Sequence, residues 1–329
     1  MLETLKLVRG AVAEKDLVPV LTHFHISDGH IQGGNGRVAI DAVLTDPVLK
    51  KINVTVPGAK FLMAVDGCKG EPTFKKTDVN LIVKRGTFRV VLPLADHDSF
   101  PITEPPHGKR LTLKVGNDLL PTLRRLRPFI GTDASRAWLC SVLIKDGYAY
   151  ASNNPIVARV PCDLPDMVLP VYTIDELMRI GIPPIAIWLS PKGNMYFDLN
   201  HKRWVYSTTL AGEWPDVEKF FDPVVIEEIA SDELREAVQR VIPFCPDAKF
   251  PELFFSDKGV STADGTMSAA VECASLPEGR WHAKNMLLIL SEATHMNLDA
   301  WPDVCRWTDV GIDGVAVGCS KELGACNES

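Results

Sequence analysis

The sequence predicts an α+β fold made of three repeated domains, each with two halves in which a short helix accompanies antiparallel strands. This prediction depends on an internal repeat. Segments 124–162 and 239–273 both run from an amphipathic helix through a Pro-Phe pair into a strand, a turn and two further strands. Segment 5–44 has the same order of elements. Because one supersecondary pattern recurs along the chain, we expect one structural unit to recur with it.

Turn residues mark the strands in the first half of each repeat. Asp28-Gly29, Asp146-Gly147 and Asp257-Lys258-Gly259 follow the first strand, and Asn35-Gly36 follows the second strand of the first repeat. Residues in such tight turns take positive φ, which Gly, Asn and Asp tolerate best. Each of these turns therefore predicts a β-hairpin.

The second half of each repeat begins with a helix after an extended stretch. These helices are predicted over 56–69, 169–181 and 279–293, and strand-like segments follow each of them. Repeats one and two then end on an aromatic-Pro pair, Phe100-Pro101 and Trp214-Pro215. With the Pro-rich stretch 101–110 as a linker, we expect three domains at 1–105, 106–217 and 218–329, the last with a polar C-terminal tail.

Composition and charge exclude several classes of protein. The 329 residues carry a formal net charge of −7, and no run reaches the roughly 18 apolar residues of a membrane-spanning helix. Glu3, Lys6 and Arg9 place charge where a signal peptide would be apolar, so we expect a cytoplasmic protein without a membrane partner. The eight cysteines have no CxxC or zinc-like spacing, and neither a metal nor a cofactor is predicted.

Basic side chains recur outside the apolar face of equivalent helices. In the second repeat, Leu119, Leu123 and Leu126 share one face at about 100° per residue, whereas Arg124 and Arg125 lie outside it. Mobile Lys and Arg side chains can neutralise a phosphate backbone without reading bases, so an acidic chain can still carry a nucleic-acid surface. The candidate contacts are Lys6, Arg9, Lys60, Arg124, Arg125, Arg127, Arg179, Arg235, Arg240 and Lys284.

The chain as a whole resembles the bacterial-type β sliding clamps, the processivity subunits of replicative DNA polymerases. The resemblance extends from the first helix to Gly318 and depends on the three repeats together with local matches. RPFIGTDASRAWLCSVLIKDG (127–147) is similar to the opening of the family's middle domain, including the run from Asp133 to Arg136. SFPI (99–102) and GEWPD (212–216) lie where clamps have their domain-ending Phe-Pro pairs.

This resemblance implies a non-enzymatic DNA polymerase processivity factor. In the family, two three-domain subunits close head to tail into a ring, with sheets outside and helices lining a hole that surrounds duplex DNA. The expected partners are therefore duplex DNA, a second copy of the chain in a homodimer, and the replicative polymerase and clamp loader, which bind through short linear peptides. The basic residues would face the hole. The alternative is a clamp-like module that does not encircle DNA and acts as a tether or decoy for clamp-binding proteins.

The resemblance also implies a partner-peptide groove between the middle and last domains. The matching residues are Leu139, Pro155, Ile156, Val157, Pro215, Lys219, Phe220, Val315 and Val317. Asn153-Asn154-Pro155-Ile156 replaces the family's Asp-Gly-His-Arg run, and the usual Met-Pro-Met-basic ending is absent. These departures indicate a divergent clamp, of a virus or mobile element, and we expect a standard clamp-binding peptide to bind it weakly.

A metal-dependent hydrolase is a further alternative, because His23, His25, Asp28 and His30 lie close together in the sequence. His23 and His25 share one face of a strand, as metal ligands would. The other two repeats have no histidine there, which favours strand histidines that are exposed or hydrogen-bonded. The sequence contains no Ser nucleophile elbow, kinase motif set or His-Glu-x-x-His, so it does not predict an enzyme.

Overall fold

The structure is a computed structural model, and it describes all residues except 16, 115, 211, 264–266, 274 and 321–329. The chain divides into two compact units. The first compact unit is Met1–Leu120 with Tyr172–Thr209, and the second is Pro121–Val171 with Leu210–Ser329. The middle repeat is thus shared between them, and the three domain limits stay a prediction. The tail beyond Ser320 lies outside the described residues.

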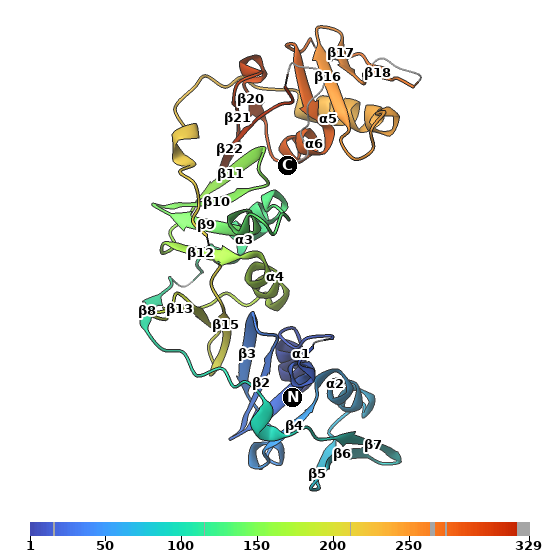
Figure 1. Ribbon diagram of the computed structural model, residues 1–329, viewed down its shortest axis with the longest axis vertical. Helices are drawn as coiled ribbons and strands as arrows, with labels where there is room; N and C mark the ends of the chain where they lie inside the picture. Colours follow the sequence, from blue (N-terminus) through green and yellow to red (C-terminus); the bar gives the residue numbers. More distant parts are fainter. Residues whose placement is uncertain (16, 115, 211, 264–266, 274, 321–329) are drawn as a thin grey trace. The chain divides into compact units, whose positions relative to one another are not determined.

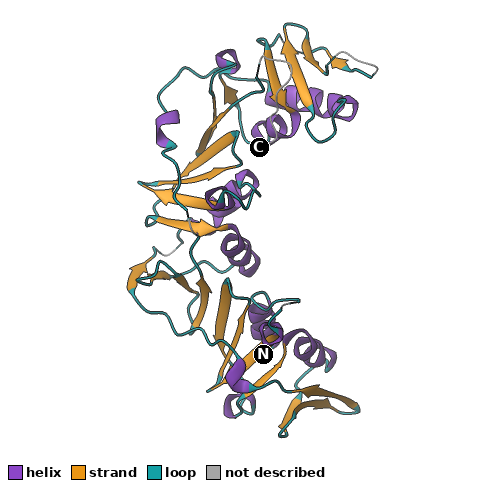
Figure 2. Cartoon of the chain, viewed as in Figure 1, coloured by secondary structure: helices purple, strands orange, loops and turns teal. Residues whose placement is uncertain are grey.

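The order of elements confirms an α+β fold with a recurring pattern (Figure 1). Each of the six helices in the described part of the chain precedes strands that pair antiparallel (Figure 2). These helices are α1 (Leu2–Arg9), α2 (Gly58–Gly67), α3 (Leu119–Leu126), α4 (Val171–Ile180), α5 (Ser231–Val241) and α6 (Ala283–Leu290). No described helix has the length and apolar character needed to cross a membrane.

The first compact unit contains an eight-stranded and a three-stranded sheet. The larger sheet has the order β4 (Val54–Pro57), β1 (His23–Ser27), β2 (His30–Gly34), β3 (Val38–Val43), β15 (Arg203–Ser207), β14 (Met195–Asp198), β13 (Ala186–Leu189), β8 (Lys109–Thr112). The smaller sheet has the order β5 (Thr73–Lys76), β6 (Asn80–Arg85), β7 (Phe88–Pro93).

The second compact unit contains a seven-stranded and a four-stranded sheet. The larger sheet has the order β12 (Met167–Pro170), β9 (Ser141–Lys145), β10 (Tyr148–Ser152), β11 (Ile156–Pro161), β22 (Ile312–Ala316), β21 (Cys305–Asp309), β20 (His295–Met296). The smaller sheet has the order β18 (Ala270–Val271), β17 (Gly259–Ser261), β16 (Glu252–Ser256), β19 (Gly279–His282).

Half-repeats join through their third strands. In the first compact unit β3 pairs with β15, from Val38↔Ser207 to Ala42↔Arg203. In the second, β11 pairs with β22 in the same way, from Ile156↔Ala316 to Arg159↔Asp313. The two remaining third strands, β7 and β18, each pair with one strand in the described part of the chain, β6 and β17 respectively. In the described part of the chain, the half-sheets that contain β7 and β18 therefore end in an open edge at the third strand. The half-sheets that contain β3, β15, β11 and β22 are joined there instead.

Turn and helix residues behave as the sequence predicts. Asp28 (φ 51°) with Gly29 (φ 80°), and Asp146 (φ 50°) with Gly147 (φ 82°), have positive φ at both central positions, which suits the twist of a hairpin. The predicted apolar helix faces are buried, with Leu5 and Val8 in α1, Leu119, Leu120, Leu123 and Leu126 in α3, and Leu234, Ala237, Val238 and Val241 in α5. Basic positions such as Arg124 and Arg240 are left exposed.

Candidate nucleic-acid and partner-binding surfaces

The candidate basic residues of the first compact unit differ in how far they are engaged. Lys60 on α2 is exposed, and Lys6 on α1 is exposed apart from an ion pair with Glu3 at 3.4 Å. The half-buried Arg9 donates from Nη1 to the carbonyl oxygen of Val12 at 2.8 Å. An exposed ammonium group keeps its freedom to follow a phosphate backbone, whereas a bonded guanidinium loses part of it.

Arg179 on α4 is the most strongly engaged of these residues. Its Nη2 donates to Glu176 Oε1 at 2.5 Å and to the carbonyl oxygen of Leu7 at 2.7 Å. The Leu7 carbonyl belongs to the last turn of α1, where carbonyl groups lack a partner within the helix. Arg179 thus caps α1, a structural role that the sequence did not suggest.

In the second compact unit the arginines of α3 divide in the same way. Arg124 is exposed. Arg125 donates to Glu292 Oε2 at 3.3 Å and to the carbonyl oxygen of Val310 at 2.7 Å, and its Nη2 lies 3.8 Å from Asp309 Oδ2. Arg125 therefore ties α3 to the turn between β21 and β22. Arg127 is half-buried.

The remaining candidates lie on α5 and α6. Arg240 and Lys284 are exposed, while Arg235 is paired with Asp232 at 2.5 Å. Asp232 and Glu233 occupy the first turn of α5, where carboxylates are favourable beside the helix N-terminus. The acidic charge is therefore gathered at one end of α5 and Arg240 at the other.

The β11–β22 joint brings five of the nine candidate groove residues together. Val157 pairs directly with Val315, Ile156 pairs with Ala316, and the Val317 amide donates to the Pro155 carbonyl at 2.9 Å. Val157, Val315 and Ile156 are buried, whereas Val317 is exposed. Of these apolar side chains, only Val317, at the end of the paired strands, is open to solvent; the others are covered.

A segment at 214–222 covers the joint and carries three more groove residues, Pro215, Lys219 and Phe220. Its Val217 and Phe221 side chains are buried in one cluster with Val157, Val315 and Tyr150. Trp214 anchors the start of the segment by donating from Nε1 to Ser141 Oγ at 2.9 Å. Sequence reasoning named the exposed residues of this segment and missed Val217 and Phe221, which hold it in place. A strand-like alternation of buried and exposed residues does not identify Val217 and Phe221, because Glu218–Phe220 between them is a 3-10 turn and not a strand.

Leu139 lies at a separate hollow of the second compact unit. The hollow has a volume of about 360 Å³ and is lined among others by Gly131, Asp133, Arg136, Leu139 and Asn154. The Gly131 amide donates to the carbonyls of Leu139 and Ser152, both at 2.9 Å, which fixes the wall of the hollow.

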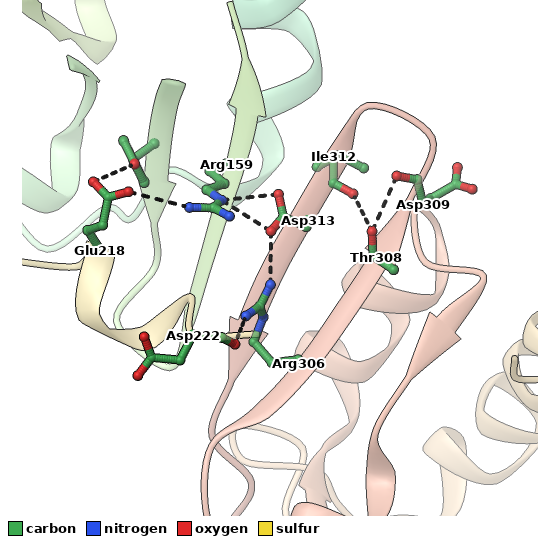
Figure 3. A network of polar contacts seen from close by, with 9 residues as sticks. Arg159, Glu218, Asp222, Arg306, Thr308, Asp309, Ile312 and Asp313 are labelled. Atoms are coloured by element: carbon green, nitrogen blue, oxygen red, sulfur yellow. Dashed lines mark hydrogen bonds and ion pairs between the residues drawn. The ribbon is translucent and has the colours of Figure 1, made fainter. Parts of the chain in front are cut away.

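A polar network crosses the β11–β22 joint beneath the 214–222 segment (Figure 3). Arg159 Nε on β11 lies 3.1 Å from both carboxylate oxygens of Asp313 on β22, and Arg306 Nη2 on β21 donates to Asp313 Oδ2 at 3.0 Å. Arg306 Nη1 donates to the backbone carbonyl of Asp222 at 2.7 Å. Glu218 Oε1 lies 3.8 Å from Arg159 Nη1.

Aromatic rings hold the two guanidinium groups of this network. Arg159 lies 4.0 Å from the centroid of Phe221 and 4.4 Å from that of Tyr148, and Arg306 lies 5.1 Å from Phe221. Cation–π contacts of this kind add to the ion pairs when the groups are desolvated. Val157 and Arg159 are two residues apart on β11, so their side chains lie on the same face of the strand. This two-residue spacing is the sequence signal that could have linked Arg159 to the candidate groove residues.

Burial and charge shift the protonation equilibria of the network. Burial lowers the pKa of Arg306, against the favourable charge of Asp313. Burial also opposes the charge on Arg159, but the hydrogen bonds and charge of Asp313 leave the pKa of Arg159 raised. Burial, with the Glu218 carboxylate nearby, raises the pKa of Tyr150 to about 12. Both arginines are charged at neutral pH, and Tyr150 keeps its proton.

The histidines proposed as metal ligands pack and bond within the first compact unit. His25 stacks between His97 (ring centroids 4.1 Å apart) and Phe100 (4.9 Å). His30 Nδ1 lies 2.7 Å from Asp41 Oδ1, and His23 Nδ1 lies 3.0 Å from the Pro19 carbonyl. In the described part of the chain, no three His, Cys, Asp or Glu side chains are grouped to hold a metal ion.

Comparison with known proteins identifies the fold. No protein-family model matches the chain, and no curated protein does either. Among solved structures, the DNA polymerase sliding clamp of Pseudomonas aeruginosa with a ligand matches with a TM-score of 0.78 and 19% identity, over 97% of both chains. The C. crescentus β sliding clamp matches with a TM-score of 0.78 and 16% identity, over 97% of this chain and 96% of that one.

A third match is the Helicobacter pylori β clamp bound to a DNA ligase peptide. It has a TM-score of 0.74 and 13% identity over 97% of both chains. The likeness therefore runs through almost the whole chain and includes the order of helices and antiparallel sheets. Three repeats, joined third strands and these matches lead to one conclusion: the chain has the fold of the bacterial β sliding clamps.

Proposed function

We propose that the protein is a DNA polymerase processivity factor, a homodimeric ring that encircles duplex DNA and tethers a replicative polymerase. One observation carries the proposal of a ring. Within the chain, half-repeats join third strand to third strand, and among the described residues this leaves the third strands β7 and β18 each with a single partner. A second copy that offers β18 to β7, and β7 to β18, continues the same pattern.

Exposed apolar side chains on β7 support this joint. Val91 is 42% exposed and Phe88 is also exposed, on a strand whose other edge is already paired with β6. An unpaired edge with apolar side chains is a template for pairing with another chain. Proteins usually cover or blunt such an edge, and a partner copy would cover this one.

Light scattering over a concentration series tests the ring. We expect twice the 36.2 kDa of one chain. Val91→Asp places a charge in the proposed joint and should leave a folded monomer, whereas Ile185→Asp, at a side chain that is 39% exposed in the same compact unit, should leave the dimer intact. A wild-type chain that stays monomeric at all concentrations would instead favour the clamp-like module that does not encircle DNA.

The exposed basic residues support the contact with DNA. Arg124, Arg240, Lys60 and Lys284 are free to move on their helices, as sliding contacts to phosphates require. Arg124→Glu with Arg240→Glu should shorten retention on nicked circular DNA while the dimer persists. Arg125→Glu serves as a contrast, because it breaks ion pairs within the chain and should lower thermal stability first. Retention that is unchanged in the double variant would remove α3 and α5 from the DNA surface.

The candidate groove residues at the β11–β22 joint support peptide tethering of the polymerase and clamp loader. Phe220 and Val317 expose apolar surface beside the buried pair Val157 and Val315. The H. pylori clamp of the same fold was solved with a DNA ligase peptide. Replacing Val317 by Asp should abolish binding of any peptide that uses this surface, and fluorescence anisotropy measures the loss.

A further inference from the structure

We propose that Arg159, with Arg306 beside it on the shared Asp313, forms an anion site next to the candidate groove residues, which Glu218 fills in the free chain and an acidic side chain of a partner peptide takes on binding. The inference rests on the proposed function, and it names the chemistry by which the groove selects its partners. It is argued from the network in Figure 3.

The two guanidinium groups are preorganised. Arg159 is held between the rings of Phe221 and Tyr148, at 4.0 and 4.4 Å, and Arg306 lies against Phe221 at 5.1 Å. Asp313 fixes both groups from a third side through bonds of 3.1 and 3.0 Å. A cation whose rotamer is already fixed loses little entropy when it binds a further anion.

The cations of the site are only partly compensated. Asp313 is the half-buried carboxylate that both arginines share, with its side chain 20% exposed. Asp222 bonds Arg306 through its backbone carbonyl, and its exposed carboxylate, which Figure 3 shows turned away from Arg306, adds a favourable charge without a bond. Arg306 Nε is buried without a hydrogen-bond partner in the described structure. A buried and a half-buried cation that share one carboxylate favour a further anion, because a charge that is removed from water without full compensation is costly.

Glu218 supplies that second anion through weak contacts. Its carboxylate lies 3.8 Å from Arg159 Nη1 and 3.4 Å from Tyr150 Oη, and its side chain is 58% exposed. Exposed ion pairs of this kind contribute little to stability, so little is lost when Glu218 turns into solvent. A peptide carboxylate that replaces Glu218 forms the same ion pair with Arg159. That pair is stronger because the bound peptide excludes water from it.

The position of the site sets the kind of peptide. Arg159 lies two residues from Val157 on β11, and Asp313 two residues from Val315 on β22, so charge and apolar surface share one face of the joint. Phe220 and Val317 extend that apolar surface at its exposed edge. The partner is therefore an extended peptide that carries an acidic residue beside large apolar ones.

Two fluorescein-labelled peptides test the site, a leucine-rich heptapeptide with one central Asp and the same peptide with Asn. Anisotropy titrations use the full chain, Glu218→Gln, and Glu213→Gln, an exposed carboxylate on the approach to the same segment, as the matched control. Removing the competing anion should tighten binding of the Asp peptide about threefold to tenfold and leave the Asn peptide unchanged. Glu213→Gln should change neither. Arg159→Lys keeps the charge but loses the planar fork, and it should bring the two peptides to similar affinity.

The outcomes separate this inference from the proposed function. Equal binding of the Asp and Asn peptides to the wild-type chain, unchanged in Glu218→Gln, overturns the anion site and leaves the groove. Binding of neither peptide to any variant removes the groove at this joint together with the anion site. A gain for both peptides in Glu218→Gln also overturns the proposal, because it shows that Glu218 acts as a steric cover rather than as a competing anion.

Discussion

The two sheet joints, β3–β15 and β11–β22, share one backbone pattern but differ in what holds the segment beside them. At the first joint the side-chain amide of Gln32 holds the segment around Thr103. Its Oε1 accepts from the Thr103 backbone amide at 2.7 Å, and its Nε2 donates to the Thr103 carbonyl at 3.0 Å. Thr103 lines a hollow with Asp41 and Trp204, which pair across the joint. At the second joint the corresponding holding groups are the charged Arg159 and Arg306.

This difference teaches what each joint can do. A neutral amide that pairs with backbone groups at both ends is satisfied within the chain, so the segment at the first joint is held without a charged side chain. The second joint holds its segment through cations that remain incompletely compensated, and exposes apolar side chains beside them. The same fold thus contains one joint whose segment is held by a neutral amide and one whose segment is held by cations beside exposed apolar side chains.

The largest expected effect is at the second joint. Asp313→Asn leaves Arg159 and Arg306 buried beside a neutral amide, and breaking a buried ion pair in this way costs about 3–5 kcal/mol of unfolding free energy. Urea unfolding measures the change. Asp222→Asn is the control, because Asp222 bonds Arg306 only through its backbone carbonyl and adds its side-chain charge from an exposed position, so the variant should lose less than about 1 kcal/mol. A loss below 1 kcal/mol in Asp313→Asn, on the scale of an exposed pair, would show that solvent already reaches the network.

The first compact unit should respond to pH, through His25 on β1. Burial and the nearby charge of His97 lower the pKa of His25 from 6.5 to about 4. The charges of Asp28 and Asp98 act in the opposite direction but are outweighed. The unfolded chain therefore binds this proton more readily than the folded one, and stability falls as pH drops from 6.5 towards 4, by up to about 3 kcal/mol.

Thermal unfolding at pH 7.5 and pH 4.5 measures this dependence. His25→Gln removes the titrating group, so the difference between the two pH values should shrink. His201→Gln alters an exposed histidine of the same compact unit and should keep the full wild-type difference. Identical pH dependence in His25→Gln and wild type would contradict the assignment. Asp41, whose pKa burial raises, acts with the opposite sign, but it is common to all three proteins.

Gln32→Ala should have a smaller effect, at the first joint. The substitution leaves the Thr103 amide and carbonyl without their partner, which costs about 1–3 kcal/mol. Chemical unfolding at pH 7.5 measures the loss, and Gln239→Ala, at an exposed position of α5, gives the baseline. A Gln32→Ala protein as stable as the baseline variant would mean that water replaces the amide without loss.

The smallest expected effect is that of Glu218→Gln on stability. Its carboxylate makes only long contacts with Arg159 and Tyr150, so the unfolding free energy should change by less than about 1 kcal/mol. The same urea titration as for Asp313→Asn gives the number. A larger loss would mean that Glu218 is a structural member of the network and not a replaceable anion.

The repeat, the hairpin turns and the helix faces could be predicted because they depend on neighbours in sequence. Positive φ at Asp28-Gly29 and at Asp146-Gly147, and the burial of Leu234 and Val238 on α5, follow from local patterns alone. The α+β fold with antiparallel pairing follows from these elements in order.

The partners of the basic side chains could not be predicted in this way. Periodicity places Arg125 outside the apolar face of α3, but it cannot show that Glu292, 167 residues later, accepts a hydrogen bond from the Arg125 guanidinium. Arg159 and Asp313 are 154 residues apart, and only the β11–β22 register brings them together. The sequence therefore identifies which helices carry positive charge, and the structure separates the arginines that hold the fold from those left exposed.

The third strands β7 and β18, which each have one partner strand in the described part of the chain, set how the proposed assembly can end. An edge that joins a different edge of the next copy is a heterologous contact, and each added copy presents the same free edges again. Growth then stops only when rotation from copy to copy closes on itself; otherwise an open filament lengthens with concentration. Under the proposed function, a variant that alters the angle at β7 without blocking it would turn the closed ring into a filament, and the proposed topological hold on DNA would be lost while every contact surface stayed intact.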